Sequence, residues 1–236
     1  MKNVLFWDID GTLLTTNRAG VAAFDEACRE IMEIEVFDWT GLDIRGATDR
    51  GIARRALDAH GKPSDDAAID RLLRCYESRL PARLAERQGQ PLPNVVAILE
   101  HLKRRTDVVS MLLTGNTRRG AREKLGYCGL LDYFHGPNGD GAPFGAFADD
   151  GVLRDHIARA AFVLAEKVAG AGVPGDRCFV IGDTPHDISC GKSIGARTVA
   201  VATGGHPAPE LQACAPWLLW EELPEPAAFE RALGLS

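Results

Sequence analysis

The chain lacks the features that mark membrane spans, polyanion binders and disulfide frameworks. No apolar run approaches the roughly 18 residues of a membrane-spanning helix, and the first residues enter an apolar segment without room for a secretion signal. Acidic residues outnumber basic ones by 33 to 27, whereas nucleic-acid binding relies on a basic surface. The six cysteines include no C-x-x-C pair, which favours reduced thiols over disulfides or zinc. We therefore expect a cytoplasmic protein that binds neither nucleic acid nor membrane, with its oligomeric state left open.

The composition is that of an ordinary globular protein. Of 236 residues, 45% are hydrophobic and 25% are charged, which gives ample material for a core. This length fits one large domain or one domain with an insert. The acidic balance does not exclude an anionic small molecule, because a metal and a few cationic groups can set the field of a local site.

Short apolar runs alternate with helical patterns along most of the chain. The runs are continuous rather than alternating, which favours strands buried on both faces of a parallel sheet; they cover residues 4–7, 108–113, 179–181, 198–201 and 217–220. Amphipathic patterns at residues 95–102 and 154–169 fit helices between them. The pattern predicts an α/β fold with a doubly wound parallel sheet.

The segment 15–90 breaks this rhythm and predicts a helical insert. Its helix-like stretches lie near residues 19–34, 50–59 and 65–88, without a convincing strand. We expect a core of residues 1–14 and 91–236 that carries a helical cap of residues 15–90. Hinges are expected near residues 14–17 and 88–93.

Two carboxylates follow the first apolar run. Asp8 and Asp10 are two residues apart, so on a continuing strand both side chains would point to one side. Their repulsion needs compensation, for which a divalent cation such as Mg²⁺ is the obvious candidate. The alternative is an acidic turn without a ligand.

Polar residues also follow two later runs. Thr114-Gly115-Asn116 follows the run at residues 108–113, and Asp183 and Asp187 follow the run at residues 179–181. Ligands of parallel sheets sit beyond the carboxyl ends of the strands, so we expect these groups to share a site. Thr and Asn also suit an ordinary helix N-cap, and Asp187 also suits the first turn of a helix.

These three segments together resemble motifs I, II and IV of the haloacid dehalogenase-like hydrolases, in that family's order. The resemblance implies a Rossmann-like core with a C1 helical cap, closest in flavour to phosphoglycolate phosphatases. It implies that Asp8 is the nucleophile that forms an aspartyl-phosphate, and that Asp10 is the general acid and base. It implies Mg²⁺ held by the carboxylates of Asp8 and Asp183 and by the main-chain carbonyl of Asp10. Asp187 would support Asp183 or a metal-bound water.

The phosphate-binding groups match the family less completely. Thr114, Gly115 and Asn116 are expected to bind phosphate oxygens, but no Lys-Pro precedes the motif IV strand, where the family usually has a lysine. Arg154 is our candidate for this cation, because guanidinium binds phosphate bidentately and stays charged. Lys124 and Lys167 are rivals, although their helical settings look like solvated faces.

The stretch at residues 41–50 resembles the cap loop that faces the active site in related phosphatases. Arg45 is a candidate for meeting a substrate carboxylate or phosphate, the alternative being a surface cation. Gly46 permits a close approach or an unusual backbone angle. Thr48 is expected to cap the next helix, with Asp49 in its first turn.

The function expected from these motifs is Mg²⁺-dependent hydrolysis of a small phosphorylated metabolite, such as phosphoglycolate or a sugar phosphate. A phosphosugar mutase is the alternative within enzymes. A binding or regulatory protein on the same scaffold is the alternative outside them. Dehalogenases of this superfamily resemble each other in lacking a residue equivalent to Asp10, so its presence here favours phosphate chemistry.

Overall fold

A parallel sheet forms the centre of the core in the computed structural model, which describes residues 2–136, 141–151, 153–170 and 172–235. Its six strands run in the order β5-β4-β1-β6-β7-β8, and every neighbouring pair is parallel. The strands are β1 (Asn3–Trp7), β4 (Val108–Leu113), β5 (Gly145–Ala146), β6 (Cys178–Gly182), β7 (Arg197–Val201) and β8 (Leu218–Trp220). This confirms the α/β prediction.

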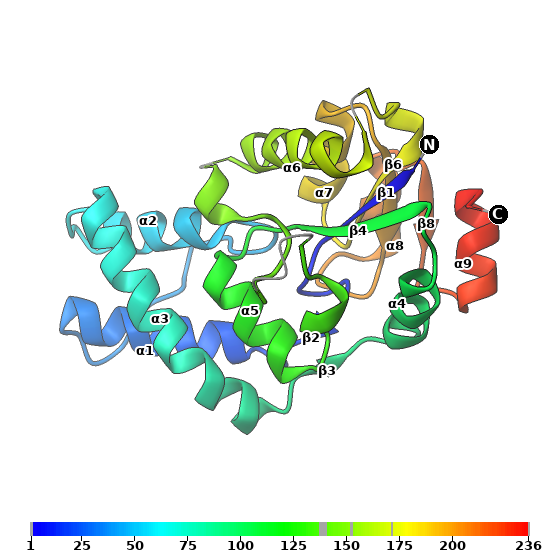
Figure 1. The fold of residues 1–236 in the computed structure, drawn as a ribbon. Coiled ribbons are helices and arrows are strands. Elements are labelled where there is room, and N and C mark those ends of the chain that lie inside the picture. The colour runs from blue at the N-terminus through cyan, green and yellow to red at the C-terminus, as the bar shows by residue number, and fades with distance from the viewer. Residues whose placement is uncertain (1, 137–140, 152, 171, 236) are drawn as a thin grey trace.

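The sheet is covered by helices on both faces (Figure 1). The core helices are α4 (Val95–Lys103), α5 (Arg118–Tyr127), α6 (Arg154–Ala169), α7 (Pro185–Ser193), α8 (Ala208–Ala213) and α9 (Pro226–Leu233), with 3₁₀ turns at Leu131–Tyr133, Ala148–Asp150 and Gly175–Arg177. Leu5 and Trp7 of β1 pack with α4, α5 and α9, whereas Val4 and Phe6 pack with α6 and α7. This alternation buries both faces of β1 and explains its continuous hydrophobic run.

Three helices form a separate hydrophobic cluster to one side of the sheet (Figure 1). They are α1 (Ala19–Met32), α2 (Asp49–Ala59) and α3 (Asp66–Arg87), close to the stretches expected in the cap. The chain leaves the core through β2 (Leu14–Thr15) and returns through β3 (Gln90–Pro91), which pair antiparallel. These short strands lie within the segments expected to act as hinges.

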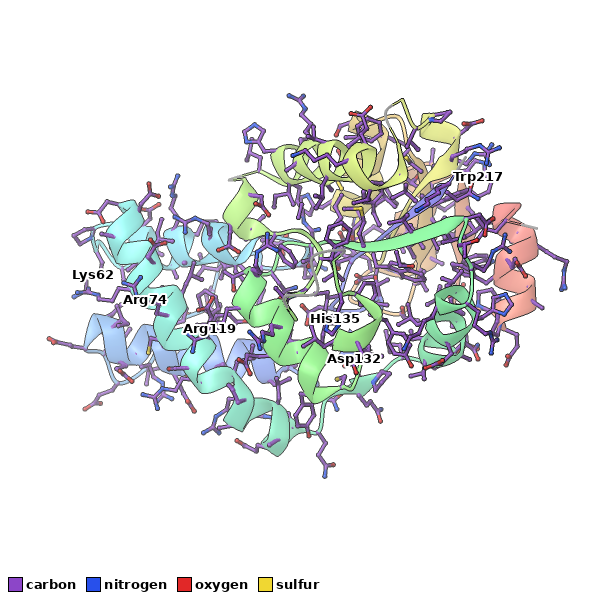
Figure 2. The ribbon with its side chains drawn as sticks, in the orientation of Figure 1. Lys62, Arg74, Arg119, Asp132, His135 and Trp217 are labelled. Carbon is purple, nitrogen blue, oxygen red and sulfur yellow. The ribbon has the colours of Figure 1, made fainter. Side chains whose placement is uncertain are left out.

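The cap helices also contact the core through α3 and α5. Glu77 of α3 accepts a hydrogen bond from Thr117 Oγ1 at 2.6 Å. Arg119 of α5 lies with its Nε 3.9 Å from Glu77 Oε2, on the side where α3 and α5 run together (Figure 2). Within the described residues, none of the helices has both the length and the apolar character needed to cross a bilayer.

Candidate active site

The register of the sheet brings the ends of three strands together. Trp7 of β1 is level with Leu112 of β4 and with Ile181 of β6. The backbone N–H of Asp8 continues this pairing by donating to the carbonyl of Ile181 at 3.0 Å. The polar segments that follow β1, β4 and β6 therefore begin at the same edge of the sheet.

Three buried carboxylates meet at this edge. Asp8, Asp183 and Asp187 each offer an oxygen, and the three oxygens lie within 4.8 Å of one another. Burial and the neighbouring charge of Asp187 raise the pKa of Asp8 to about 7, and burial and the charge of Asp8 raise the pKa of Asp183. Within the described residues, Asp8 Oδ1 is buried without a hydrogen-bond partner. Crowded carboxylates with an unsatisfied oxygen fit a hard divalent cation such as Mg²⁺.

Asp187 is held by the start of helix α7. Its Oδ2 accepts hydrogen bonds from Thr184 Oγ1 at 2.7 Å and from Thr184 N at 3.1 Å, while Thr184 Oγ1 accepts from Asp187 N at 3.3 Å. This reciprocal capping box fixes the carboxylate. Asp187 therefore takes part in capping α7 and also lies beside Asp183.

Asp10 is directed away from this carboxylate group. Its Oδ2 accepts hydrogen bonds from Asn116 Nδ2 at 2.8 Å and from Lys124 Nζ at 2.6 Å. Strand β1 ends at Trp7, so the strand periodicity expected to align Asp8 and Asp10 does not extend through both residues. Both still line the same pocket, where their side chains have different partners.

Lys124 is a component of the site that the sequence did not identify correctly. Its amine is buried, with 5% of the side chain exposed, so the expectation of a solvated helical face was wrong. Burial lowers the pKa of Lys124, but the charges of Asp10 and Asp49 outweigh it and the pKa is raised overall. The reason is tertiary, because α3 packs on α5 and encloses this face. Lys167, the other rival, is exposed.

Arg154, our candidate for the cation that replaces the motif III lysine, lies beside two of the buried carboxylates. Its Nη1 lies 3.1 Å from Asp187 Oδ1 and 3.5 Å from Asp8 Oδ1, and 9% of its side chain is exposed. Burial lowers the pKa of Arg154, but the charges of Asp187 and Asp8 outweigh this effect, so the pKa is raised overall. Its Nε also donates to the carbonyl of Gly46 in the cap loop at 3.2 Å. The guanidinium of Arg154 thus contacts Asp8, Asp187 and the cap loop.

The segment after β4 forms a tight turn in which the capping role belongs to the next residue. Thr117 caps α5, because its Oγ1 accepts from Gly120 N at 3.0 Å. Thr114 Oγ1 accepts from Asn116 Nδ2 at 2.9 Å and from Asn116 N at 3.3 Å. Gly115 and Asn116 line the pocket. Thr114 and Asn116 are therefore not the N-cap of α5.

The cap loop lies directly against these core segments. Gly46 has a φ of 65°, and a Cβ there would lie 2.7 Å from His186 Cδ2 and 2.9 Å from Thr184 Oγ1. Asp49 N donates to the carbonyl of Gly115 at 2.7 Å, and Asp49 Oδ2 accepts from Thr117 N at 2.8 Å. The sequence suggested only a place in the first turn of α2 for Asp49. Its contact with the core is a second role that had no local signal.

Other expectations for the cap loop have a simpler outcome. Thr48 caps α2 by accepting a hydrogen bond from Gly51 N at 3.0 Å, as predicted. Arg45 lines the pocket, but its Nε is paired with Asp43 Oδ1 at 3.3 Å and 57% of its side chain is exposed. Contact between Arg45 and substrate stays a prediction.

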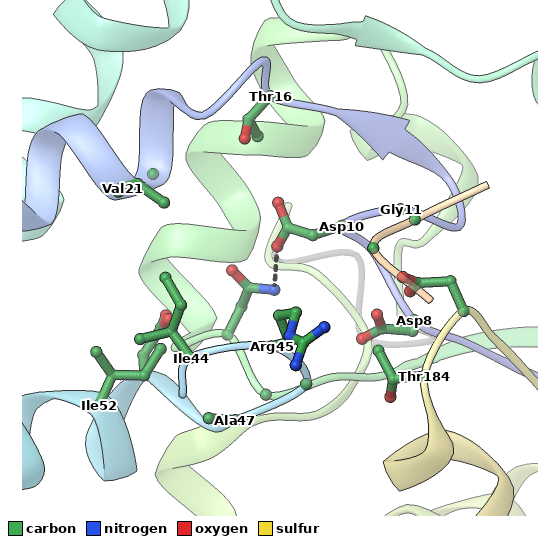
Figure 3. A pocket seen from close by; sticks show the side chains of 18 of the residues that line it. Asp8, Asp10, Gly11, Thr16, Val21, Ile44, Arg45, Ala47, Ile52 and Thr184 are labelled. Atoms are coloured by element: carbon green, nitrogen blue, oxygen red, sulfur yellow. Dashed lines mark hydrogen bonds between the residues drawn. The ribbon is translucent and has the colours of Figure 1, made fainter. Parts of the chain in front are cut away.

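A cavity of about 510 Å³ lies between the core and the cap. Figure 3 shows Asp8, Asp10 and Thr184 on the core side of this cavity, and Val21, Ile44 and Ile52 on the cap side. Asp183, Lys124 and Arg154 complete the polar side. An anionic group could bind here among cations and hydrogen-bond donors, next to a carboxylate with an unbonded oxygen. This arrangement suits nucleophilic attack on phosphorus.

Known proteins with similar sequences carry phosphatase names. The chain is 25% identical over 204 residues to "Putative pyrophosphatase PpaX" of Clostridium perfringens, covering 85% of this chain and 84% of that protein. It is 26% identical over 239 residues to "Probable phosphatase IndB" of Dickeya dadantii, covering 99% of this chain and 95% of that protein.

The fold also matches that of solved structures. CbbY from Rhodobacter sphaeroides, in complex with phosphate, aligns with a TM-score of 0.72 and 18% identity, covering 94% of this chain and 95% of that chain. A sequence model described as haloacid dehalogenase-like hydrolase matches residues 2–195. The chain therefore belongs to the haloacid dehalogenase-like hydrolases, the family that its motifs predicted.

Proposed function

We propose that this protein is a Mg²⁺-dependent phosphomonoesterase that works through a phosphorylated Asp8. The observation that carries the proposal is the buried Oδ1 of Asp8, which accepts no hydrogen bond from the described residues and lies beside Arg154 and Asp183. Family membership supports a hydrolase, and the phosphatase names of the relatives support phosphate esters as substrates. The phosphate bound to CbbY supports the same chemistry.

In the first step, an oxygen of Asp8 attacks phosphorus and the bond from phosphorus to the ester oxygen breaks. The backbone around Gly115 would donate hydrogen bonds to the phosphate, with Arg154 supplying positive charge, and Asn116 would do so by exchanging its bond to Thr114 or Asp10. Arg154 is already held at 3.1 Å by Asp187, so little reorganisation is needed when substrate binds. Asp10 would give its proton to the departing alkoxide.

In the second step, Asp10 would take a proton from water as the water attacks phosphorus and Asp8 is released. Asn116 and Lys124 bind the same oxygen of Asp10, and 40% of the Asp10 side chain is exposed. This arrangement fixes the carboxylate while it keeps access to the pocket. Such proton transfer contributes typically about 10²- to 10⁴-fold to a rate.

The metal ligands proposed from the chain are the carboxylates of Asp8 and Asp183 and the main-chain carbonyl of Asp10. When bound, Mg²⁺ would supply positive charge that offsets the repulsion between the Asp8 carboxylate and an incoming phosphate. Asp187 keeps Arg154 beside the pair and would support Asp183. The cytoplasmic location expected from the sequence stays a prediction.

Phosphate release from a panel of monoesters tests the proposal. We expect turnover with Mg²⁺ and its loss with EDTA, and we expect Asp8→Asn to remove it. Asp176→Asn is the matched control, because Asp176 is exposed just before β6. Full activity of Asp8→Asn, or equal activity in EDTA, would contradict the mechanism. Formation of an isomeric phosphosugar without phosphate release would favour the mutase instead.

A further inference from the structure

The cap side of the cavity carries a group of apolar side chains, in contrast to the core side. Val21 of α1, Ile44 of the cap loop and Ile52 of α2 all line it, and they gather opposite Asp8 in Figure 3. All three are only partly buried. Val21 and Ile44 belong to none of the hydrophobic core clusters formed by the described residues. The apolar surface of Val21 and Ile44 is therefore available to a ligand rather than used for packing.

Aromatic rings extend this apolar wall and hold it in place. Phe24 and Tyr76 line the cavity and contact each other with ring centroids 4.7 Å apart. Trp39 lies edge-on to Phe24 at 6.3 Å, and its Nε1 donates to Asp25 Oδ1 at 3.1 Å. Because Phe24 and Tyr76 are otherwise buried in the cap cluster, the wall is preformed.

The cations around the cavity differ in whether a carboxylate already pairs with them. Of the four arginine and lysine side chains that line the cavity, three already have carboxylate partners, and the fourth, Arg18, is exposed. Lys124 is paired with Asp10, Arg154 with Asp187, and Arg45 with Asp43. Of these, Arg154 stands beside Asp8, where the transferred phosphate would bind. Arg45, the cation of the cap loop, is neutralised by Asp43 from the same loop.

The size of the cavity also fits a substrate with a substantial body. At about 510 Å³, it lies in the range of roughly 300–1,000 Å³ that is typical of pockets enclosing drug-sized ligands. Phosphoglycolate would occupy the polar side and leave the apolar wall without a partner. Burying that wall against a hydrophobic leaving group would add binding free energy in proportion to the area removed from water.

We propose that the substrate is the phosphate monoester of a hydrophobic alcohol, whose apolar body lies against Val21, Ile44 and Ile52 while its phosphate meets Asp8. This inference rests on the proposed phosphatase function. Hydrolysis breaks the bond between phosphorus and the ester oxygen, and water supplies the oxygen to phosphate and the proton to the alcohol. The apolar wall selects the alcohol and takes no part in the bond changes.

A homologous series of alkyl phosphates tests this proposal. Ethyl, butyl, hexyl and 2-phenylethyl phosphates have alcohols of similar acidity, so differences in kcat/KM report mainly contacts with the apolar body. We expect kcat/KM to rise about two- to fourfold for each added methylene that is buried. Phosphoglycolate and glycerol phosphate should lie at the low end.

Variants of the wall give the matched comparison. Val21→Asn and Ile44→Asn should flatten the dependence on chain length, so that the loss of kcat/KM grows from ethyl to hexyl phosphate. Val36→Asn is the control, because Val36 is 79% exposed and does not line the cavity; it should keep the wild-type dependence.

The outcomes separate this inference from the proposed function. Activity with a flat series, or a preference for phosphoglycolate, overturns the hydrophobic substrate and leaves the phosphatase intact. Unchanged slopes in Val21→Asn and Ile44→Asn overturn the assignment of the wall. Failure to release phosphate from any ester, including p-nitrophenyl phosphate with Mg²⁺, overturns the phosphatase function and this inference with it.

Discussion

The two sides of the cavity are built in different ways. On the core side, the carboxylates and the polar turn follow the strands β1, β4 and β6, so their positions are set by the register of one sheet, while Lys124 and Arg154 come from helices α5 and α6. The cap side includes apolar side chains from α1, α2 and the loop between them, together with Arg45 of that loop. Short motifs thus specify the chemistry, whereas packing of the cap specifies the surface that a leaving group would meet.

The two sides are joined by a small number of polar contacts. Arg154 donates to the carbonyl of Gly46, and Asp49 bonds to both Gly115 and Thr117. Changes in the core groups should therefore affect the chemical step most, and changes at these contacts should affect it less. The predictions below follow that order.

Replacing Asp10 should produce the largest effect that depends on the leaving group. We expect Asp10→Asn to lower kcat for alkyl phosphates by about 10²- to 10⁴-fold. The loss should be smaller for p-nitrophenyl phosphate, because nitrophenolate departs without a proton. Steady-state rates on both esters give the ratio. Equal losses on both would mean that Asp10 acts through structure, for example by leaving the buried Lys124 unpaired.

Replacing Arg154 should have the next largest effect on kcat, and it tests the positive charge beside Asp8. We expect Arg154→Met to lower kcat by on the order of 10²- to 10³-fold, because it removes a preorganised charge next to Asp8. Arg154→Lys should recover part of that loss, since an ammonium cannot reproduce the several donors of the guanidinium.

Another arginine on helix α6 provides the matched control for the Arg154→Met variant. Arg159→Met should behave as wild type, because Arg159 is exposed on α6. If Arg154→Met kept kcat within twofold, the assignment of Arg154 as the motif III cation would fail.

Separating the cap loop from the core should have a smaller effect. In Gly115→Ala, the new Cβ would lie 2.8 Å from the carbonyl oxygen of Ala47, so the loop must shift. We expect kcat/KM to fall by about tenfold, since a misplacement of about 1 Å can cost up to about 10²-fold. Gly126→Ala is the control, because no atom of the described residues outside its own helix backbone and chain neighbours lies within 4 Å of its Cβ position. Equal kcat/KM in the two variants would argue against a role for this contact.

Replacing Asp49 should change the free energy of unfolding more than turnover. The pKa of Asp49 sets how this change depends on pH. Burial raises the pKa of Asp49 from 3.8 to about 6, so the folded state holds its proton more tightly than the unfolded state does. This contribution to stability is full below about pH 4 and is lost as the pH rises through about 6. The displacement corresponds to on the order of 3 kcal/mol.

Denaturant unfolding of Asp49→Asn and wild type across this pH range measures the effect. The variant should gain stability relative to wild type as the pH rises from about 4 to about 7. Asp58→Asn, on the exposed face of the same helix, should show no such trend. A difference that stays constant with pH would contradict the buried state of Asp49.

The sequence predicted that the residues after three strands lie together at one edge of the sheet, and it predicted little of the contacts that enclose them. Asp8, Thr114 and Asp183 were identifiable because each follows an apolar run, and parallel strands end at one edge. Arg154 was a candidate because of its position before the motif IV strand, and its role there stays a prediction. The helices of the cap were also predicted closely, because periodicity is a local property of the sequence.

Contacts between distant segments had no comparable signal. Lys124 looked like a residue on a solvated helix face, since a lysine on a helix does not reveal that α3 will cover it. Its partner Asp10 is 114 positions away. Strand β5 is two residues long, too short to show a periodicity. The apolar residues of the cap wall share no sequence pattern that marks them, so only the structure shows which of them face the cavity.

The central claim is that Asp8 carries the phosphoryl group during turnover. Borohydride reduces an acyl phosphate to an alcohol, so quenching the enzyme with borohydride during turnover and sequencing its peptides by mass spectrometry locates the site. The account predicts homoserine at position 8, absent without substrate and absent in Asp8→Asn. Reduction at a different residue, or none at position 8 while the quenched enzyme is turning over, would contradict it.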